Sequence, residues 1–448
     1  MNLKQLGLTL VLVTSHQLSN AQTAITTAFT LKEAQDYAIK NSVILSNSAI
    51  DMQIAQAKVK ETMGMGLPQI SGSFDVKDFL VIPTSLLPAQ IFGGPAGSFI
   101  PVKFGTKYNA TLGLSASQLI FSSDYLIGVQ ATKTYLELTQ KSANVSNNDI
   151  KSNVAKAYYG VLVNKERLTL LTANIARIEK LLSDTKAFNK QGFVELIDVD
   201  RIEVLYNNLV SEKQKIEKLV TLTETVLKFQ MNYDTQQPIQ LTDKIEQGID
   251  VSNIALSDVK LDVTNRPEYA LLETNLKLNL LDLKRNRLSY LPTMVAYGAY
   301  SGNAQRSKFD VFKVGEPWFQ TAIIGATINV PIFSGFQKHF KTQQAALNVM
   351  KTQNNMRNLQ NGISLETQSS LTSYSNAVVS ISNNKRNIDL AKNVYEVSKK
   401  KYDQGVGSNL EVTTAATALK EAETNYAVAL YDYYIAKIDY EKATGTIK

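Results

Sequence analysis

The clearest pattern in the chain is an alternation of apolar and small polar residues over positions 108–117. Tyr108, Ala110, Leu112, Leu114 and Ala116 alternate there with Asn109, Thr111, Gly113, Ser115 and Ser117. A period of two predicts a strand with one apolar and one polar face. Segment 69–77 alternates in the same way, and 322–329 does so except at Ile323, whereas 293–301 is apolar on both faces. We therefore predict four strands in two hairpins.

Proline positions predict where long helices run, because proline breaks a helix interior. The stretches 102–237 and 332–448 contain no proline, and both are rich in helix-forming residues with apolar side chains three and four positions apart. One such stripe consists of Leu171, Ile175, Ile178 and Leu182. About 70 residues precede the glycines at 192 and 405, which as continuous helix would extend on the order of 100 Å.

A second helical stripe indicates how the helices pack. It recurs at seven-residue intervals, at Ile381, Ile388, Tyr395 and Tyr402. Other apolar residues lie on the far side of the same helix, at Leu390, Val394 and Val397. This helix is therefore expected to bury two faces against two neighbours, as in a closed ring of helices.

The chain contains an internal repeat. Asn41 matches Asn265 at a shift of 224 (265 − 41), and Gly192 matches Gly405 at a shift of 213 (405 − 192). Leu67-Pro68 matches Leu291-Pro292 at the first of these shifts. Each half is predicted to run helix, two strands, long helix, turn, helix.

Composition excludes several functional classes. The chain has 448 residues, no cysteine and two histidines, so disulfides, thiolate metal sites and cysteine nucleophiles are absent and a histidine-based catalytic triad is disfavoured. Its net charge of +7 comes from 47 basic and 40 acidic residues without a basic block, which disfavours nucleic acid as a partner. We predict no cofactor, no metal site and no enzymatic activity.

The first residues predict export. Lys4 precedes the apolar stretch 6–13, and Ser19-Asn20-Ala21 resembles a signal-peptidase site, so residues 1–21 are expected to be a signal peptide. No apolar segment reaches the length of about 18 residues that a membrane-spanning helix needs.

Two interpretations of the strands remain open from their pattern alone. A soluble sheet with one buried face would show the same alternation as a strand in an outer-membrane barrel. Aromatic residues near the strand ends favour the membrane, and the candidate lipid-interface aromatics are Tyr108, Phe121, Trp318 and Phe333. The candidate lumen residues on the polar faces are Asn109, Thr111, Ser115, Ser117, Thr327 and Asn329.

Four strands cannot close a barrel, and lipid does not tolerate open sheet edges, so several chains would have to pool their strands. Two chains would give eight strands with a filled interior, and three would give twelve with room for a lumen.

Several segments together resemble the TolC-like outer-membrane efflux protein family. They are Leu31-Lys32-Glu33-Ala34, Asn265-Arg266-Pro267-Glu268, Tyr290-Leu291-Pro292, Tyr402-Asp403-Gln404-Gly405 and Asn409-Leu410-Glu411-Val412. The resemblance implies a mainly α fold with a β-barrel portion. It implies a homotrimer with a shared twelve-stranded barrel in the outer membrane of a Gram-negative bacterium and an antiparallel helical tunnel, or α-barrel, in the periplasm.

The resemblance also implies partners and a function. The protein would be a passive exit channel of a tripartite efflux or type I secretion system, with a periplasmic adaptor and an inner-membrane efflux pump or secretion ATPase as partners. The family's periplasmic tip turns match Gly192 and Gly405, which together with Tyr402 and Gly407 are the candidate adaptor contacts. Asn189 stands where the second half has Tyr402.

The expected boundaries follow from the repeat. They are 1–21 signal peptide, 22–66 N-terminal helices, 67–121 first hairpin, 122–231 long helix and return helix, 232–262 linker, 263–291 second-half first helix, 292–333 second hairpin and 334–448 second long helix and return helix. The segment 80–106 is expected to be a long apolar loop.

Acidic residues near the second tip turn have two interpretations. Asp389, Glu396 and Asp403 recur every seven residues, so in a threefold assembly they would form rings of negative charge at a gate. Alternatively they form a solvated face balanced by Lys392, Lys399 and Lys400.

A trimeric outer-membrane adhesin or structural protein is the alternative function, because it also pools strands from several chains. Its strands should be consecutive at the C-terminus, whereas here helix is expected after the last strand. The sequence does not distinguish a drug pump, a metal exporter and a protein-secretion ATPase as the partner.

Overall fold

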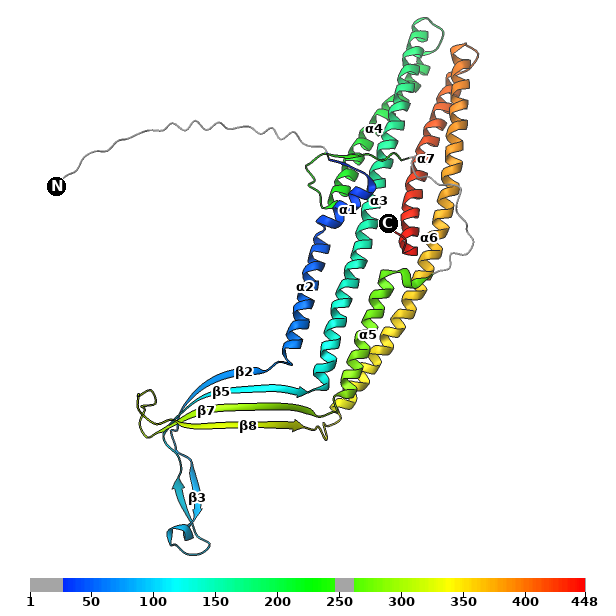
Figure 1. Cartoon of the computed structure of the whole chain (residues 1–448). Helices are drawn as coiled ribbons and strands as arrows, with labels where there is room; N and C mark the ends of the chain where they lie inside the picture. The colour runs from blue at the N-terminus through cyan, green and yellow to red at the C-terminus, as the bar shows by residue number, and fades with distance from the viewer. Residues whose placement is uncertain (1–26, 246–261, 448) are drawn as a thin grey trace, which may run out of the picture. The chain divides into compact units, whose positions relative to one another are not determined.

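We describe a computed structural model of the chain over residues 27–245 and 262–447. The predicted signal peptide 1–21 lies outside the described residues, as does the part of the linker at 246–261. The chain divides into two compact units, whose helices and strands are labelled in Figure 1. Unit 1 comprises Met1–Asn41, Asn153–Ile254 and Asn376–Ile435, and unit 2 comprises Ser42–Ser152, Ala255–Ser375 and Ala436–Lys448.

The predicted strands form one four-stranded antiparallel sheet in unit 2, in the order β2-β5-β7-β8. The strands are β2 (Gln69–Asp78), β5 (Tyr108–Phe121), β7 (Thr293–Arg306) and β8 (Phe319–Asn329). The prediction of two hairpins is confirmed, including the segment 293–301 whose alternation is poor. Strands β2 and β8 are the edges of this sheet.

A second, smaller hairpin occupies the segment predicted as a loop. It pairs β3 (Thr84–Pro88) with β4 (Phe99–Lys103), and a 3-10 turn at Ala89–Phe92 follows β3. The apolar loop expected over 80–106 thus contains a hairpin of its own between β2 and β5. Four of the ten proline residues lie between 83 and 101. Proline is tolerated here because both strands are edges and the first and last residues of a strand need not donate to the ladder.

The helices of unit 2 lead into the strands and out of them. They are α2 (Val43–Gly64) before β2, α5 (Pro267–Leu288) before β7, and the first parts of α3 (Ser123–Lys190) and α6 (Gln337–Asp403). Leu283 of α5 packs against Ala345 and Val349 of α6. Leu67-Pro68 and Leu291-Pro292 stand at the two helix-to-strand junctions, where proline stops the helix.

Unit 1 contains the remainder of α3 and α6 with α4 (Leu196–Met231) and most of α7 (Asn409–Thr444). All four helices contribute to one buried cluster of apolar residues. Its members are Leu171, Ile178, Leu181, Leu182, Val199, Ile202, Leu209, Ile216, Tyr395, Tyr402, Val412, Ala415, Ala416 and Leu419. The first stripe predicted from the helical spacing lies in or against this core, and Tyr395 and Tyr402 of the second stripe lie in it.

Unit 1 also contains a short two-stranded parallel sheet. Strand β1 (Thr27–Phe29) pairs with β6 (Ile239–Leu241), and α1 (Leu31–Asn41) follows β1. The carboxylate of Asp243 accepts hydrogen bonds from the backbone N–H of Leu31 at 2.8 Å and from the hydroxyl of Tyr158 at 2.9 Å. Residues 232–245 of the predicted linker are thus anchored against α1 and α3.

The element bounds reproduce the internal repeat. Helices α2 and α5 end 224 residues apart (288 − 64), and α4 and α7 end 213 residues apart (444 − 231). Each half runs helix, two strands of the sheet, long helix, turn and helix. The hairpin of β3 and β4 has no counterpart in the second half among the residues that the structure describes.

Candidate functional site

The register of the sheet places all six candidate lumen residues on one face. Paired residues of antiparallel strands point to the same face. Thr111 pairs with both Asp75 and Asn303, and Ser115 pairs with Ser71. The hydroxyl of Thr111 donates to the Asn303 side chain at 2.8 Å, and the hydroxyls of Ser71 and Ser115 are hydrogen-bonded at 2.8 Å. The pairing of Thr327 and Asn329 with Val295 and Thr293 puts them on the same face.

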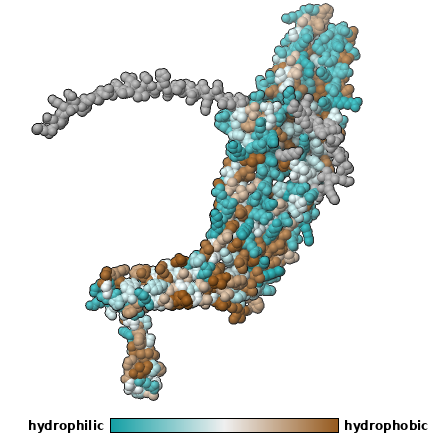
Figure 2. Space-filling view, in the orientation of Figure 1, coloured by the Kyte–Doolittle hydropathy of each residue, from teal (hydrophilic) through white to brown (hydrophobic). Residues whose placement is uncertain are grey.

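The opposite face of the sheet is apolar and mostly bare, except at one end, where Ala110 and Ala304 are buried against Val311. Its exposed large side chains are Ile70, Phe74, Val76, Leu112, Leu114, Tyr300, Ile324 and Ile328. Ile324, in the middle of β8, is 91% exposed. Figure 2 shows such hydrophobic side chains in brown along the strands. A contiguous apolar patch of this kind needs a cover, and the alternation matches a strand between lipid and water.

A β-bulge in β5 determines on which face of the sheet the candidate interface residue Phe121 lies. Tyr108 and Phe121 are an odd number of positions apart, so a regular strand would put their rings on opposite faces. The register shifts between Leu119 and Phe121, and Phe121 then pairs with Met294 of the apolar face. The bulge therefore brings Tyr108 and Phe121 to the same face, at the two ends of β5.

The second-half aromatics lie outside the strand that was expected to contain them. β8 runs from Phe319 to Asn329, so Trp318 immediately precedes it and Phe333 lies in the segment between β8 and α6. The expected hairpin boundary at 333 lies four residues beyond the end of β8 (333 − 329). Trp318 packs against β7, because a Cβ added at Gly302 would lie 3.4 Å from its ring.

The two helix turns of unit 1 have glycines in a left-handed conformation. Gly192 and Gly405 both have φ of 78°, a region that residues with a Cβ rarely adopt. The backbone N–H of Gly405 donates to the Tyr402 carbonyl at 2.9 Å, and that of Gly407 donates to the Lys401 carbonyl at 3.1 Å. A Cβ at Gly407 would lie 2.9 Å from the Lys401 Cβ. The glycines at 192, 405 and 407 are thus required by the turns themselves.

Tyr402 supports its turn from inside. Its side chain is 6% exposed, its hydroxyl is hydrogen-bonded to that of Thr185 on α3 at 3.1 Å, and its ring meets Phe188 edge-on. Asn189, its counterpart in the first half, instead donates from its side-chain amide to the Val194 carbonyl at 2.8 Å. The candidate contact surface therefore consists of the exposed turn residues, and Tyr402 holds the second turn against α3.

The three acidic candidates are exposed along one side of α6, but they are not equivalent. Asp403 forms an ion pair with Lys399 on the same helix, with 2.7 Å between the carboxylate oxygen and the lysine Nζ. Burial alone would lower the pKa of Lys399, but the hydrogen bond and charge of Asp403 outweigh it and raise the pKa. The charge of Asp403 is thus balanced by Lys399 within its own helix, and Asp389 and Glu396 are exposed further along the same side.

Polar residues that the sequence pattern did not reveal tie α7 to α3 and α4. Glu423 of α7 is buried and accepts hydrogen bonds from Asn174 and, at 2.8 Å, from Arg177 of α3. Lys420 of α7 pairs with Glu212 of α4 at 2.9 Å. The sequence around a polar residue of a helix is similar whether its side chain faces solvent or a neighbouring helix. No local signal therefore distinguishes the buried Glu423 from the exposed Glu421.

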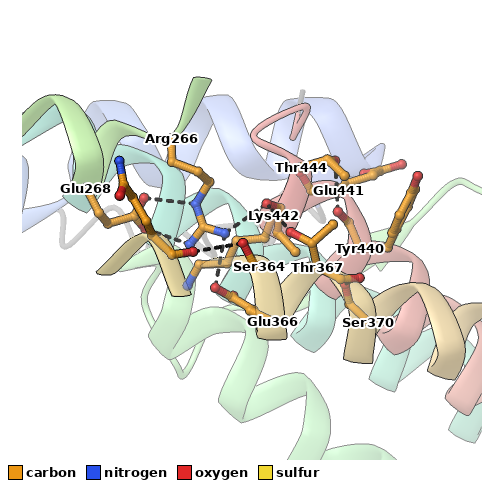
Figure 3. A network of polar contacts seen from close by, with 12 residues as sticks. Arg266, Glu268, Ser364, Glu366, Thr367, Ser370, Tyr440, Glu441, Lys442 and Thr444 are labelled. Carbon is orange, nitrogen blue, oxygen red and sulfur yellow. Dashed lines mark hydrogen bonds and ion pairs between the residues drawn. The ribbon is translucent and has the colours of Figure 1, made fainter. Parts of the chain in front are cut away.

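The Asn265-Arg266-Pro267-Glu268 motif builds a polar junction in unit 2 (Figure 3). Pro267 opens α5, where its missing N–H costs nothing. The buried guanidinium of Arg266 binds Glu268 at 3.0 Å, Glu366 of α6 at 3.1 Å and the carbonyl of Ala443 at the end of α7 at 3.0 Å. The motif thus fastens the end of α7 to α5 and α6, which is a structural role.

This junction also sets the ionisation of Glu268. Burial by itself raises the pKa of the carboxyl, but hydrogen bonds from Arg266 and the backbone, with the charges of Arg266 and Lys442, outweigh burial and lower the pKa below the ordinary 4.5. Glu268 is therefore charged and paired at neutral pH.

Metal-binding chemistry has no candidate within the described ranges: no group of three or more histidine, aspartate or glutamate side chains there is placed to hold an ion. Among the same residues, none of the helices combines the length and the apolar character that a membrane span requires.

Comparison with known proteins gives the family. The sequence model for "Outer membrane efflux protein" matches residues 265–446, which is the second half of the repeat. The outer membrane protein TolC of Vibrio cholerae is 20% identical over 352 residues, covering 75% of this chain and 76% of that protein. Residues 265–446 therefore belong to the family of outer-membrane efflux proteins, and the chain is TolC-like over three quarters of its length. This family consists of channel proteins.

Further relatives extend the likeness. The protease secretion protein PrtF of Dickeya chrysanthemi is 20% identical, covering 67% of this chain and 64% of that protein. The crystal structure of the outer membrane protein VceC from Vibrio cholerae superposes with a TM-score of 0.73 at 13% identity, covering 93% of this chain and 96% of that one. The TolC-like fold therefore extends over nearly the whole chain. As a member of this family, the protein resides in the Gram-negative outer membrane and extends into the periplasm.

Proposed function

We propose that this protein is the passive outer-membrane exit channel of a tripartite efflux or type I secretion system and that it works as a homotrimer. The observation that carries the proposal is the four-stranded sheet, with one largely exposed apolar face, one polar face and two unpaired edges, continuous in sequence with two helices of 68 and 67 residues. Lipid would cover the apolar face, and the polar face would line the water-filled interior.

The free edges of the sheet require partners. An edge strand in lipid leaves backbone N–H and C=O groups without hydrogen bonds, which is costly. Pairing β2 of one copy with β8 of the next removes both edges. Three copies give twelve strands, which is wide enough for a lumen, whereas eight strands would be filled by side chains.

The helices offer a matching surface for the neighbouring copies. Ile381, Tyr395 and Tyr402 of α6 face the core of unit 1 and are buried, whereas Leu390, Val394 and Val397 lie on the other side of the helix and are exposed. A solvated helix does not usually carry an apolar stripe of this kind. Its burial against a second copy would complete a ring of helices, the tunnel of the proposed channel.

The tip turns are the proposed docking points for a periplasmic adaptor, which in turn would bind an inner-membrane pump or secretion ATPase. Gly192, Gly405 and Gly407 shape these turns, and Phe193 and Val406 beside them are exposed. Small exposed turns with adjacent apolar side chains suit a contact between helix ends. TolC and the secretion protein PrtF are both relatives, so the proposal includes efflux and secretion.

Asp389 and Glu396 are proposed to favour cations at the narrow end of the tunnel, with Asp403 contributing less because Lys399 neutralises it. Replacing all three acids by asparagine should then reduce the cation preference in single-channel recordings, and Asp403→Asn alone should change it least. Unchanged ion selectivity in the triple variant would show that these acids form a solvated outer face.

The proposal is tested by native mass and planar-bilayer conductance on the same purified sample. A trimer with small, cation-selective openings is the expected result. A stable monomer, or a trimer that never conducts even with the three acids replaced, would contradict the proposed channel and favour a structural role.

A further inference from the structure

The hairpin of β3 and β4 is the largest feature of unit 2 that the proposed channel does not use. It is inserted between β2 and β5, whose other ends adjoin α2 and α3. It therefore lies at the end of the sheet remote from the helices. Since the helices extend into the periplasm, this end is the outer opening of the proposed barrel.

The surface of this hairpin is apolar and nearly uncharged. Its exposed large side chains are Leu80, Val81, Leu86, Ile91, Phe92, Phe99, Ile100 and Phe104. Lys103 is the only charged residue between positions 79 and 106. A two-stranded hairpin alone is marginally stable in water, and a contiguous apolar surface of this kind indicates a contact. In Figure 2 this hairpin shows brown side chains at its free end.

The charge of the hairpin argues against the membrane surface as its cover. Segments that lie on an anionic lipid surface carry clusters of lysine and arginine beside their apolar residues. The hairpin has one lysine, Lys103, which pairs in register with Thr84 at the base. Conversely, the absence of charge along the rest of the hairpin allows several copies to approach one another without repulsion.

The position of the hairpin in the chain favours a second copy of the same protein as its cover. Strand β2 is an edge of the sheet and must pair with a neighbouring copy in the proposed trimer. The hairpin follows β2 after a short connection, so it continues from the same intermolecular boundary. We propose that the three hairpins of one trimer pack against each other and form an apolar cap over the outer opening of the barrel. This inference rests on the proposed trimeric channel.

The 3-10 turn at Ala89–Phe92 is the end of the hairpin that would reach the centre of the cap. Ala89 is buried beneath the turn, and Gly93 and Gly97 have φ of 78° and 82°, which closes the chain tightly there. Ile91 and Phe92 consequently project from the tip, 67% and 61% exposed in the single chain. Val81 lies at the base, near the barrel wall, and is also exposed.

Cysteine cross-linking tests the cap directly, because the natural chain contains no cysteine. Phe92→Cys is expected to form disulfide-linked dimers on intact cells under a membrane-impermeant oxidant. Val81→Cys is the matched control in the same hairpin, and it is expected to stay monomeric on a denaturing gel because the barrel wall keeps the three bases apart.

The remaining outcomes of this test each overturn the cap. Equal cross-linking of both variants would indicate random collision. The absence of cross-links in Phe92→Cys would show that the three hairpin tips do not contact one another. A polarity-sensitive dye on Phe92→Cys would then show whether lipid or water surrounds the tip. Native mass is measured on the same preparations: a trimer without tip cross-links overturns only the cap, whereas a monomer overturns the proposed channel.

A second experiment measures the consequence of the cap. In a Ser115→Cys protein, the thiol lies on the polar face of the barrel, and a bulky impermeant maleimide reaches it from outside through the outer opening. Replacing residues 84–103 by a short Gly-Ser turn is expected to raise the labelling rate several-fold. Equal labelling rates with and without the hairpin would show that the hairpins do not obstruct the opening.

Discussion

The helical core of unit 1 and the sheet of unit 2 differ in how far their apolar side chains are buried within the chain. In unit 1, four helices of one chain enclose a single cluster, and Leu181 and Ile202 have no exposed surface. In unit 2, the sheet buries little on its apolar face, and Ile324 and Ile70 remain almost bare. Both regions carry apolar residues at regular spacing in the sequence. In unit 1 other helices of the same chain bury these residues, whereas in unit 2 the chain leaves most of them exposed.

This difference identifies the surfaces that the environment must cover. A helix can bury one stripe within its own chain and leave a second for a neighbour, as α6 does with Tyr395 inside and Val394 outside. A four-stranded sheet without helices on either face has no such choice, because both faces stay open unless lipid, water or other copies cover them. The bare surfaces of this molecule are therefore the ones that specify its location and assembly.

The largest effect of a substitution is expected on the apolar face of the sheet, which lipid would cover. Ile324→Lys places a charge at the middle of β8 on the apolar face, at a cost of about 2–4 kcal/mol per copy near the bilayer centre. Three copies share the proposed barrel, so insertion into bilayers should be nearly abolished. The measurement is the folded fraction recovered in lipid vesicles across a urea series.

Ser115→Lys is the matched control on the polar face of β5. It is expected to insert normally and to shift ion selectivity towards anions, because its charge faces water. If both lysine variants inserted equally well, the assignment of the two faces would be wrong.

The next largest effect is expected inside unit 1, where the cover is the chain itself. Tyr402→Ala removes a buried ring, which typically costs about 3–5 kcal/mol. Hydrogen exchange should show faster local opening around the second helix turn and around Thr185. Tyr402→Phe keeps the ring and loses only the bond to Thr185, worth about 1 kcal/mol. Identical exchange in the two variants would mean that the hydroxyl, not the ring, holds the turn.

A smaller effect is expected from the polar tie between α7 and α3. Glu423→Ala leaves Asn174 buried and Arg177 partly buried without their acceptor, at a cost of about 1–3 kcal/mol. Glu421→Ala, two residues away and exposed, should change stability by less than about 0.5 kcal/mol. Thermal unfolding of both variants in detergent separates them. Equal midpoints would show that solvent replaces the lost acceptor.

The smallest effect is a pH dependence at the Arg266 junction. The pKa of Glu268 is lower in the folded protein than its ordinary value of 4.5. Its contribution is thus fully present above pH 4.5 and is lost as the pH falls through the lowered folded value. The contribution should stay within about 1 kcal/mol, because Glu268 is partly exposed. Glu268→Gln should flatten this part of the stability profile, and an unchanged profile would assign the acid sensitivity to other carboxylates.

Much of the fold follows from local periodicity in the sequence. The alternation at 108–117 indicated β5, and the spacing of Leu171, Ile178 and Leu182 indicated the buried side of α3, because a strand and a helix repeat with different periods. The repeat between Asn41 and Asn265 supplied the order of elements in both halves. Strand β7 was placed by this repeat, since its own pattern is apolar on both faces.

Other features depend on contacts between distant segments. Phe121 joins Tyr108 on one face only because of a bulge against β7, which local alternation does not reveal. Tyr402 was both a member of a buried stripe and a candidate adaptor contact, and only the contacts with Thr185 and Phe188 of α3 show that its side chain is enclosed. The ties of Glu423 and Arg266 likewise join residues far apart in sequence.

Residue spacing along the chain specifies the long helices, the four strands of the sheet, the twofold repeat and the two-sided character of the strands. Contacts between distant segments settle which apolar stripes the chain covers and which polar residues are paired. They also form the hairpin of β3 and β4 within the expected apolar loop. These outcomes depend on register and on distant partners, such as Lys103 for Thr84 at a separation of 19 (103 − 84) and Ser115 for Ser71 at a separation of 44, and no local pattern records such partners.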